Sequence, residues 1–336
     1  NNQPLLVVDG SPVSLGMLNT INPNDVEDIN ILKGASAASL YGQDGVNGVI
    51  LIKTIRGSKG GAPVVKVSNS TQFESVLFLP DFQTRFGSGS GVDANGFGIY
   101  DPVENQQYGD EYDGSIREIG KPLPTGIQQE VYSYKPNGRK SFFETGVTMQ
   151  NYISYSAKDF LLSAQDVDIK GTLGGDKNRR TTLRIASSKE YGAFKAGFSA
   201  NYIRGQYNVA SVSPYWEVFN TPGHIQLDKY KNWRDLSSDA SPNHYFNEYY
   251  HNPYFIKDRS RSTGYSDDIF AQVDFSLKIT SWLTAIYRAS TTNNVSDYKN
   301  TAEAFVFSDY AKNVTHKYNA SNNLTAGVSD GSSRSN

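Results

Sequence analysis

The stretch from Asp268 to Thr280 places an apolar side chain at every second position. These apolar residues are Ile269, Ala271, Val273, Phe275, Leu277 and Ile279. Because successive side chains of a β-strand point to opposite faces, the pattern predicts a strand with one apolar and one largely polar face. About eleven residues is the length that a tilted strand needs to cross a membrane. We therefore expect a membrane-spanning barrel strand here, paired with an antiparallel strand that starts near Leu283.

Weaker copies of this alternation recur along the chain, and about seven strands are expected in total. They lie at 64–75, 145–156, 159–168, 179–188 and 193–207. The connections between them are in turn long (76–144), short (157–158), intermediate (169–178), short (189–192) and long (208–267). Outer-membrane barrels have short turns on the periplasmic side and long loops on the other, so the alternation supports the strand assignments independently.

The composition excludes several other classes of protein. No run approaches the ~20 apolar residues of a membrane-spanning helix. A net charge of -2 over 336 residues gives no basic surface for nucleic acid. The chain has no cysteine, which excludes disulfide scaffolds and thiolate metal sites. Its 22 tyrosines fit the aromatic girdles of a barrel.

The strand count predicts only part of a barrel. The smallest barrels have about eight strands, and plugged outer-membrane transporters have about 22. An open sheet edge in lipid leaves unpaired backbone groups that cost several kcal/mol each. The polar tail from Ser329 to Asn336 also lacks an aromatic-ended final strand. We expect roughly the first third of such a barrel over residues 61–336, preceded by a small α/β domain over residues 1–60.

Residues 23–54 carry the pattern of that small domain. Asn22 or Asn24 can cap a short helix that starts at Pro23, with acidic residues in its first turn. Val26, Ile29, Ile31 and Leu32 would form the buried side of this helix. Gly34 would end it, before a turn of small residues over 35–39. Gly45 and Gly48 permit a tight reversal into 49–52, an apolar run that predicts a fully buried strand.

The same stretch resembles the plug signature of the SusC/RagA family of TonB-dependent outer-membrane transporters. The matching residues are Val7 to Gly10, Asn22 to Asp25, Val26-Glu27, Ile29, Ile31-Leu32-Lys33, Ala35-Ser36-Ala37, Tyr41-Gly42, Asn47-Gly48-Val49-Ile50, Ile52 and Thr54. Gly34 and Gln43 depart from it, where the family often has Asp and Ser. Phe142 to Gly146 resembles the family's FFxTG at the start of a barrel strand.

The resemblance implies a fold, a function and a set of partners. The fold is a membrane β-barrel, partial here and of about 22 strands when whole, with an N-terminal α/β plug domain. The function is import of oligosaccharides or oligopeptides across the bacterial outer membrane. TonB-ExbB-ExbD would supply the energy by displacing the plug, through an N-terminal segment absent from this sequence, and a SusD-like surface lipoprotein would act as a lid. The alternatives are a non-transporting scaffold of an outer-membrane complex and a siderophore transporter, against which the SusC-type plug residues argue.

Two sets of residues are candidates for function. The plug motif set is structural and consists of Asp9, Gly10, Asn22, Pro23, Asp25, Glu27, Lys33, Tyr41, Gly42, Asn47 and Gly48. The second set lies in the aromatic-rich loop over 207–255, where substrate or lid contact is weighed against packing of the loop on itself. Its members are Tyr215, Trp216, Tyr230, Trp233, Tyr249 and Tyr250.

Other chemistry is not expected. The glycines at 42, 45 and 48 lack the Lys-Ser/Thr of a phosphate loop and lead into a strand. Asp93, Asn95 and Asp101 do not follow Ca²⁺ loop spacing, so a solvated loop is expected. His224, His244, His251 and His316 lack metal-ligand spacing and read as surface or loop residues. No nucleophile motif is present, so we expect neither an enzyme, nor a cofactor, nor a metal site.

Overall fold

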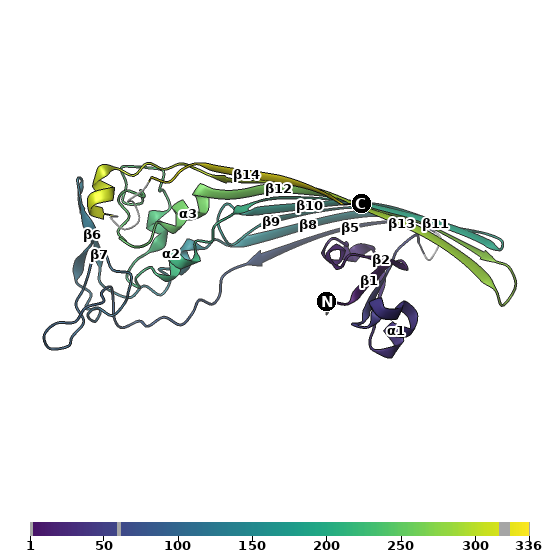
Figure 1. The fold of residues 1–336 in the computed structure, drawn as a ribbon, viewed down its shortest axis with the longest axis horizontal. Coiled ribbons are helices and arrows are strands. Elements are labelled where there is room, and N and C mark those ends of the chain that lie inside the picture. Colours follow the sequence, from purple (N-terminus) through teal and green to yellow (C-terminus); the bar gives the residue numbers. More distant parts are fainter. Residues whose placement is uncertain (1–2, 59–61, 316–322, 336) are drawn as a thin grey trace.

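The computed structural model describes residues 3–58, 62–315 and 323–335. These residues form a long curved sheet, a small N-terminal unit on its concave face, and a layer of folded loops at one end (Figure 1). We call these the wall sheet, the plug unit (residues 3–58) and the loop layer. Within the described residues, no helix has the length and apolar character needed to cross a membrane.

The wall sheet has eight strands, and each strand pairs antiparallel with its neighbours in the order β14-β13-β12-β11-β10-β9-β8-β5. The strands are β5 (Val64–Glu74), β8 (Gly146–Ala157), β9 (Phe160–Lys170), β10 (Lys177–Tyr191), β11 (Phe194–Ala210), β12 (Ser260–Lys278), β13 (Thr284–Ala302) and β14 (Gly327–Ser335). The expected strands are present. The structure adds one further strand, β14, in the polar segment that was expected to be a tail. A polar segment can form this strand because its hydrogen bonds to β13 come from the backbone and not from the side chains.

The two faces of the wall sheet follow the alternation seen in β12. Phe270 and Gln272 point to the concave side and are about 1–2% exposed, whereas Ile269, Val273 and Phe275 on the convex side are 40–45% exposed. Phe275 also stacks with Phe194 of β11 and Tyr287 of β13, with ring centroids 6.0 and 6.4 Å apart. An apolar outer face with a cluster of aromatic rings is the pattern of a lipid-facing barrel wall and its interfacial girdle.

The connections between wall strands are sorted by length to opposite ends of the sheet. Residues 158–159, 192–193 and 279–283 make short turns at the end near the plug unit (Figure 1). At the other end, 75–145, 211–259 and the segment between β13 and β14 are the long connections, and 171–176 is the intermediate one. This arrangement confirms the predicted alternation of short turns and long loops.

The plug unit has a four-stranded sheet in the order β2-β1-β4-β3. Its strands are β1 (Leu5–Val8), β2 (Ser11–Val13), β3 (Val26–Leu32) and β4 (Val49–Thr54), and its helices are η1 (Leu15–Asn19), η2 (Pro23–Asp25), α1 (Ala35–Tyr41) and η3 (Gly42–Gly45). β1 runs parallel to β4 along Leu5↔Val49 to Val8↔Ile52, and these central strands supply most of the buried apolar residues. The last plug strand ends at Thr54 and the first wall strand starts at Val64; the boundary predicted at residue 60 lies outside the described residues.

Two predictions for the plug unit are wrong. The expected helix from Pro23 is only the short 3₁₀ helix η2, because Val26–Leu32 is the edge strand β3 and pairs antiparallel with β4. Ile29 and Ile31, expected to be buried, are therefore 54% and 62% exposed. The small residues expected to form a turn after Gly34 form the helix α1 instead. β-branched residues favour a strand when a partner strand is in reach, which outweighs the acidic helix-start signal.

The loop layer folds around aromatic cores. It contains the hairpin β6 (Ile116–Leu123) and β7 (Gly126–Val131), with the helices η4 (Lys140–Phe142), α2 (Tyr215–Phe219), η5 (Leu227–Tyr230), α3 (Pro253–Arg259) and the π-helical turn η6 (Ala311–Thr315). One core joins all three long connections, since Phe142 of the first and Phe255 of the second belong to one cluster, against which Phe305 of the third packs. The long loops are thus a packed layer rather than separate flaps.

Candidate functional site

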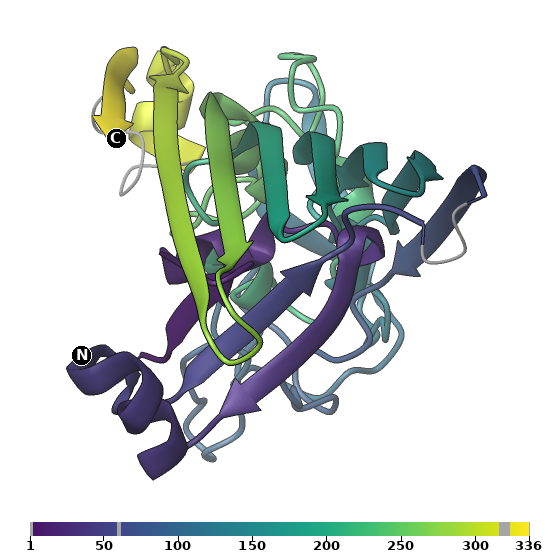
Figure 2. The same ribbon diagram turned by 90° about the vertical axis from the view of Figure 1, so that its right-hand side faces the viewer.

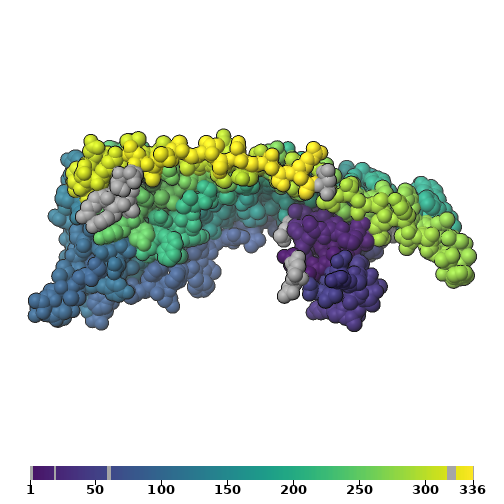
Figure 3. Space-filling model, viewed as in Figure 1, coloured from purple at the N-terminus to yellow at the C-terminus, as the bar shows by residue number. Residues whose placement is uncertain are grey.

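The plug unit lies against the concave face of the wall sheet, close to its short turns (Figures 1 and 3). Seen along the sheet, the plug strands cross beneath the wall strands (Figure 2). The contact between the two bodies is the candidate functional site. It consists of two groups of polar contacts, which we call the anchor turn and the ionic joint, and of one apolar contact.

The anchor turn is the segment Asn22 to Asp25. Asn22 caps η2 by accepting a hydrogen bond from the Asn24 backbone N–H at 3.0 Å, and Pro23 follows at the first helical position. This tight turn brings the Asp25 carboxylate, 3% exposed, to the wall. There Asp25 accepts hydrogen bonds from Tyr152 Oη of β8 at 2.8 Å and Ser163 Oγ of β9 at 2.9 Å.

A third wall residue contacts the same turn. Gln165 Nε2 of β9 donates to Asn22 Oδ1 at 2.9 Å, and Asn22 Nδ2 lies 3.3 Å from Asp25 Oδ2. The signature residues Asn22 and Asp25 are therefore contacts between plug and wall as well as elements of the plug's own fold. A buried carboxylate with several donors is well satisfied, so this turn is a stable seat on β8 and β9.

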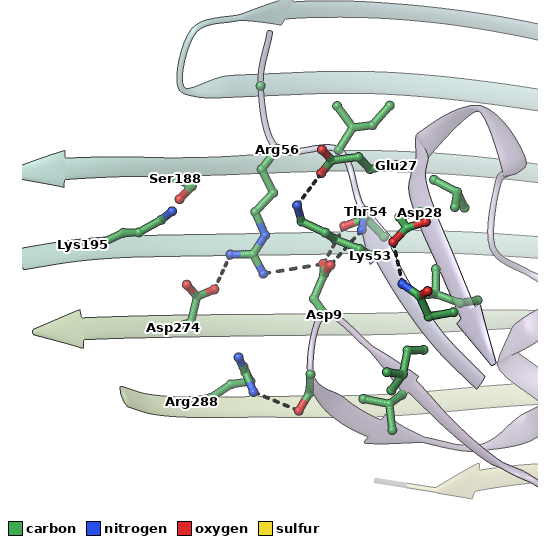
Figure 4. A pocket seen from close by; sticks show the side chains of 18 of the residues that line it. Asp9, Glu27, Asp28, Lys53, Thr54, Arg56, Ser188, Lys195, Asp274 and Arg288 are labelled. Carbon is green, nitrogen blue, oxygen red and sulfur yellow. Dashed lines mark hydrogen bonds and ion pairs between the residues drawn. The ribbon is translucent and has the colours of Figure 1, made fainter. Parts of the chain in front are cut away.

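The ionic joint gathers around Asp9, which follows β1. Its carboxylate accepts from the Thr54 backbone N–H at 2.8 Å and from Thr54 Oγ1 at 2.5 Å. Arg56 Nη2 lies 3.5 Å from Asp9 Oδ2, and Arg56 Nη1 pairs with Asp274 of β12 (Figure 4). Asp9 and Arg56 thus connect the start of the plug unit, its end and the wall.

Further wall residues complete the ionic joint. Arg184 of β10 donates to Thr54 Oγ1, to the Ile55 carbonyl at 3.2 Å and to Asn201 Oδ1 of β11 at 3.0 Å. Gln272 Nε2 of β12 donates to the Asp9 carbonyl at 3.1 Å, and Arg288 Nη1 of β13 donates to the Gly10 carbonyl at 2.9 Å. The apolar contact is Phe270, which packs with buried plug residues such as Leu6.

The joint borders space that water can enter. A hollow of about 1020 Å³ lies between the end of the plug unit and the wall, lined by charges of both signs such as Lys53, Glu27 and Lys195 (Figure 4). Several buried wall atoms have no hydrogen-bond partner within the described residues: Gln165 Oε1, Thr182 Oγ1, Arg184 Nε, Ser199 Oγ and Gln272 Oε1. Buried polar atoms of this kind are ordinarily satisfied by ordered water, so the contact has the chemistry of a wet interface.

The structure divides the predicted plug motif residues into two groups. Asp9, Gly10, Asn22 and Asp25 meet the wall, as described above. The others belong to the fold or the surface of the plug unit. Pro23 starts η2, Tyr41 packs beside Ala37, Gly42 caps α1 with a φ of 60°, and Gly48 has a φ of 94°. Glu27 pairs with Lys53 at 3.1 Å, and Lys33 and Asn47 are exposed. At Gly48 a Cβ would also lie 3.1 Å from the Leu32 carbonyl oxygen, so both conformation and space favour glycine there.

The predicted aromatic contact residues also fall into two groups. Tyr230 and Trp233 are 4% and 5% exposed and belong to the loop cores, which fits the alternative that the loop packs on itself. Trp216 is 70% exposed, Tyr215 and Tyr249 are exposed, and Tyr250 is half-buried. Tyr215 stacks on Phe219 and lies at a tilt to Phe143, with ring centroids 5.9 Å away in each case, so neighbouring rings support this exposed side chain.

A buried histidine lies among tyrosine rings in the loop layer. His224 lies in a loop, as expected, but is only 2% exposed, and its ring lies 5.3 Å from the Tyr132 ring and 6.1 Å from the Tyr100 and Tyr112 rings. Burial lowers the pKa of His224 to about 4 and raises the pKa of Tyr112 to about 12. The imidazole is therefore neutral at physiological pH and acts as an aromatic core residue.

Nearby cations are also removed from water. Burial lowers the pKa of Arg139 to about 10, and its guanidinium lies 4.0 Å from the centre of the Phe82 ring. Arg117 lies 3.9 Å from the centre of the Tyr132 ring and pairs with Asp110 and Asp113, each at 2.7 Å. These cation–π contacts and ion pairs tie the first long loop to itself.

Among the residues that the structure describes, no three His, Asp or Glu side chains gather in one place. In the candidate Ca²⁺ loop, the Asp93 carboxylate is used by the backbone N–H groups of Asn95 at 2.9 Å and Phe97 at 2.8 Å. His316 lies outside the described residues.

Sequence reasoning missed the wall side of the site. The residues concerned are Tyr152, Ser163, Gln165, Arg184, Gln272, Asp274 and Arg288, together with Arg56 in the linker. Strand alternation places their side chains on the polar, inward face. It does not tell which of the many inward positions lie beneath the plug unit.

Comparisons with known proteins agree with this architecture. The family model for the TonB-dependent receptor plug domain matches residues 1–49. The chain is 36% identical over 223 residues to the TonB-dependent receptor SusC of Bacteroides thetaiotaomicron, which covers 62% of this chain and 20% of the relative. It is 42% identical over 83 residues to the TonB-dependent receptor P26 of Formosa agariphila, covering 24% of this chain and 8% of the relative.

A solved structure shares the fold. The RagAB peptide importer in its closed-closed state matches with a TM-score of 0.65 at 18% identity, covering 90% of this chain and 36% of the importer chain. The present chain thus spans about a fifth of the SusC relative and about a third of the solved importer chain. The likeness confirms the predicted fold, a plug domain seated in part of a β-barrel.

Proposed function

Since the chain carries the plug and part of the barrel of a SusC/RagA-type TonB-dependent transporter, we propose that the protein imports oligosaccharides or oligopeptides across the bacterial outer membrane. Its relatives are TonB-dependent receptors, a family of outer-membrane proteins. The observation that carries the proposal is the joint between plug and wall. It holds the plug unit on the wall through buried hydrogen bonds and ion pairs, which are polar contacts that water can replace.

The physical requirement for such a transporter is a plug that blocks the lumen at rest and moves when pulled. A dry, close-packed interface resists shear, because its contacts cannot be replaced as the surfaces slide. Polar groups can exchange a partner side chain for water at small net cost. The anchor turn, the ionic joint and the hollow beside them supply this kind of interface.

The proposed energy source is TonB-ExbB-ExbD, which would pull on the plug from the periplasm. The proposed lid is a SusD-like lipoprotein resting on the loop layer, whose packed cores offer a firm surface. The exposed platform of Tyr215 and Trp216, with Tyr249, is the proposed contact for substrate or lid, because aromatic faces suit both sugar rings and peptide side chains.

Uptake in cells tests the proposal. Cells that express the full-length protein would be given fluorescent oligosaccharides and oligopeptides with and without TonB depletion. We expect uptake of one substrate class that is lost when TonB is depleted. Uptake that is the same in cells lacking the protein would contradict import and favour the scaffold alternative. Purification in mild detergent checks the lid, which should copurify as a lipoprotein.

A further inference from the structure

Asp9 has an unusual backbone conformation for its residue type. Its φ is 50°, and among the described residues all others with positive φ are glycines. Aspartate tolerates this left-handed region better than most residues, yet the conformation is still unfavourable and persists only where its surroundings hold it. The Asp9 side chain is 4% exposed, and its carboxylate is held by three contacts, two with Thr54 and one with Arg56.

Because of the position of Asp9 in the chain, these contacts connect the start of the plug unit to its end. Asp9 lies between β1 and β2, at the start of the plug unit, whereas Thr54 ends β4 and Arg56 enters the linker to the wall. The carboxylate therefore fastens the β1–β2 hairpin to the segment through which the plug unit is covalently joined to the barrel. Arg56 extends the connection to Asp274 on β12.

The wall is shaped to admit this connection. Gly197 of β11 is the register partner of Asp274. A Cβ at Gly197 would lie 2.6 Å from Arg56 Nη1 and 2.8 Å from Asp274 Oδ2, closer than atoms can approach without moving. The missing side chain thus leaves the space that the Arg56–Asp274 pair occupies.

The two polar contacts with the wall differ in their access to water. The Asp25 carboxylate of the anchor turn is buried between β8 and β9. Arg56 and Asp274 are each 18% exposed at their side chains and line the hollow beside the joint, together with Asp9. Water and ions can reach this pair and replace its partners when the plug unit is strained.

We propose that Asp9 is the lock of the plug unit: its carboxylate ties the β1–β2 turn to Thr54 and Arg56, beside the parallel β1–β4 ladder, and its release loosens this end of the plug unit on the wall. Arg184 and Asp274 hold the wall side of the lock through their contacts with Thr54, Ile55 and Arg56. The proposal rests on the proposed import function. It adds which contact opens first.

The lock is tested by passive leak in the full-length protein, without TonB. Asp9→Asn keeps the shape and the tolerance of positive φ but removes the charge, and Asp44→Asn on the exposed turn of the plug is its matched control. We expect Asp9→Asn to raise the entry of a large hydrophilic antibiotic, and channel conductance in planar bilayers, by about tenfold. Asp44→Asn should leave both unchanged.

A second variant approaches the lock from the wall. Gly197→Ala should push the Arg56–Asp274 pair apart and raise leak, whereas Gly205→Ala on the same strand meets only Ser266 Oγ, at 3.0 Å, and should not. Heat-modifiable migration on gels reports that the barrel has assembled in each variant. Assembled Asp9→Asn and Gly197→Ala proteins that both stay as tight as wild type would overturn the proposal. Because leak is measured without TonB or substrate, it is separate from loss of import.

Discussion

The plug–wall joint and the loop layer lie at opposite ends of one sheet and are held by opposite kinds of contact. The joint depends on hydrogen bonds and ion pairs centred on Asp9 and Asp25, with Phe270 as its main apolar contact. The loop layer depends on buried aromatic rings, such as Phe142 against Tyr254 with centroids 4.7 Å apart. The difference indicates that the plug unit is held by contacts suited to movement, whereas the loop layer is held by contacts suited to a fixed structure.

The physical reason is how each contact responds to water. Apolar contacts lose free energy in proportion to the area exposed, so a dry aromatic core opens only as a whole. Polar contacts in a joint can be exchanged one by one for water, so they hold position while resisting displacement less. Four predictions test this contrast, taken from the largest expected effect to the smallest.

Removing a ring from the loop core should have the largest effect. Phe255 is 1% exposed and packs against Trp233 and Phe305 with centroids 5.1 Å away in each case. Phe255→Ala should cost about 3–5 kcal/mol of loop stability, because it leaves a cavity in a dry core. Hydrogen exchange should show all three long loops opening together while the plug unit is unchanged. Phe78→Ala, at an 89% exposed ring, is the control; loops that open singly would contradict one shared core.

Acidification should loosen the loop layer through His224. The pKa of His224 is about 4 in the folded layer and about 6.5 when unfolded, so between these values the unfolded state binds more protons. Stability is therefore full above pH 6.5 and falls as the pH drops toward 4, by about 3 kcal/mol. Hydrogen exchange of the loops from pH 7 to pH 4 measures this, after correction for intrinsic rates. A His224→Phe variant should make the profile shallower without flattening it, because burial also lowers the pKa of His251 in the same layer to about 4. An equally steep profile would assign the loss to other groups.

Truncating the anchor turn should have a smaller effect, confined to the joint. Asp25→Ala leaves the hydroxyls of Tyr152 and Ser163 without their acceptor, which costs about 1–3 kcal/mol unless water replaces it. Limited proteolysis should show faster cleavage in the plug unit and unchanged loops. Asp28→Ala, on the exposed edge strand β3, is the matched control. Equal protection of Asp25→Ala and wild type would mean that the apolar contact alone seats the plug unit.

The smallest effect is expected at an exposed ion pair of the loop layer. Arg234 makes two 3.0 Å contacts with Glu303, joining two long loops, and the side chains are 58% and 50% exposed. Glu303→Gln should change loop stability by less than about 1 kcal/mol, and added salt should remove even that difference. Denaturant unfolding at low and high salt measures it. A larger, salt-resistant loss would show that the layer also depends on charge.

Much of the fold follows from local pattern. The alternation in β12 predicts both the strand and the face that turns outward, because side chains of a strand alternate regardless of what lies on either side. The sorting of short and long connections follows from the same assignments. β3 is the exception, since its acidic start predicts a helix, and only pairing with β4 makes it a strand.

Only the plug side of the candidate site can be predicted from local sequence pattern. Asn22, Asp25 and Asp9 stand out as a signature on the plug side, and their residue types suit buried polar contacts. The exposed or buried state of the loop aromatics could not be predicted, because Trp216 and Trp233 lie in the same aromatic-rich loop yet are 70% and 5% exposed.

By itself, the sequence determined the strands, their inward and outward faces, the small α/β unit at the start and the plug residues fit for polar contact. The tertiary structure alone decided which wall residues meet them. Ser163 is 138 residues from Asp25, and Asp274 is 218 residues from Arg56. Contacts at such separations depend on the register and curvature of the whole sheet, which bring certain inward positions of the strands beneath the plug unit and leave other inward positions facing open space.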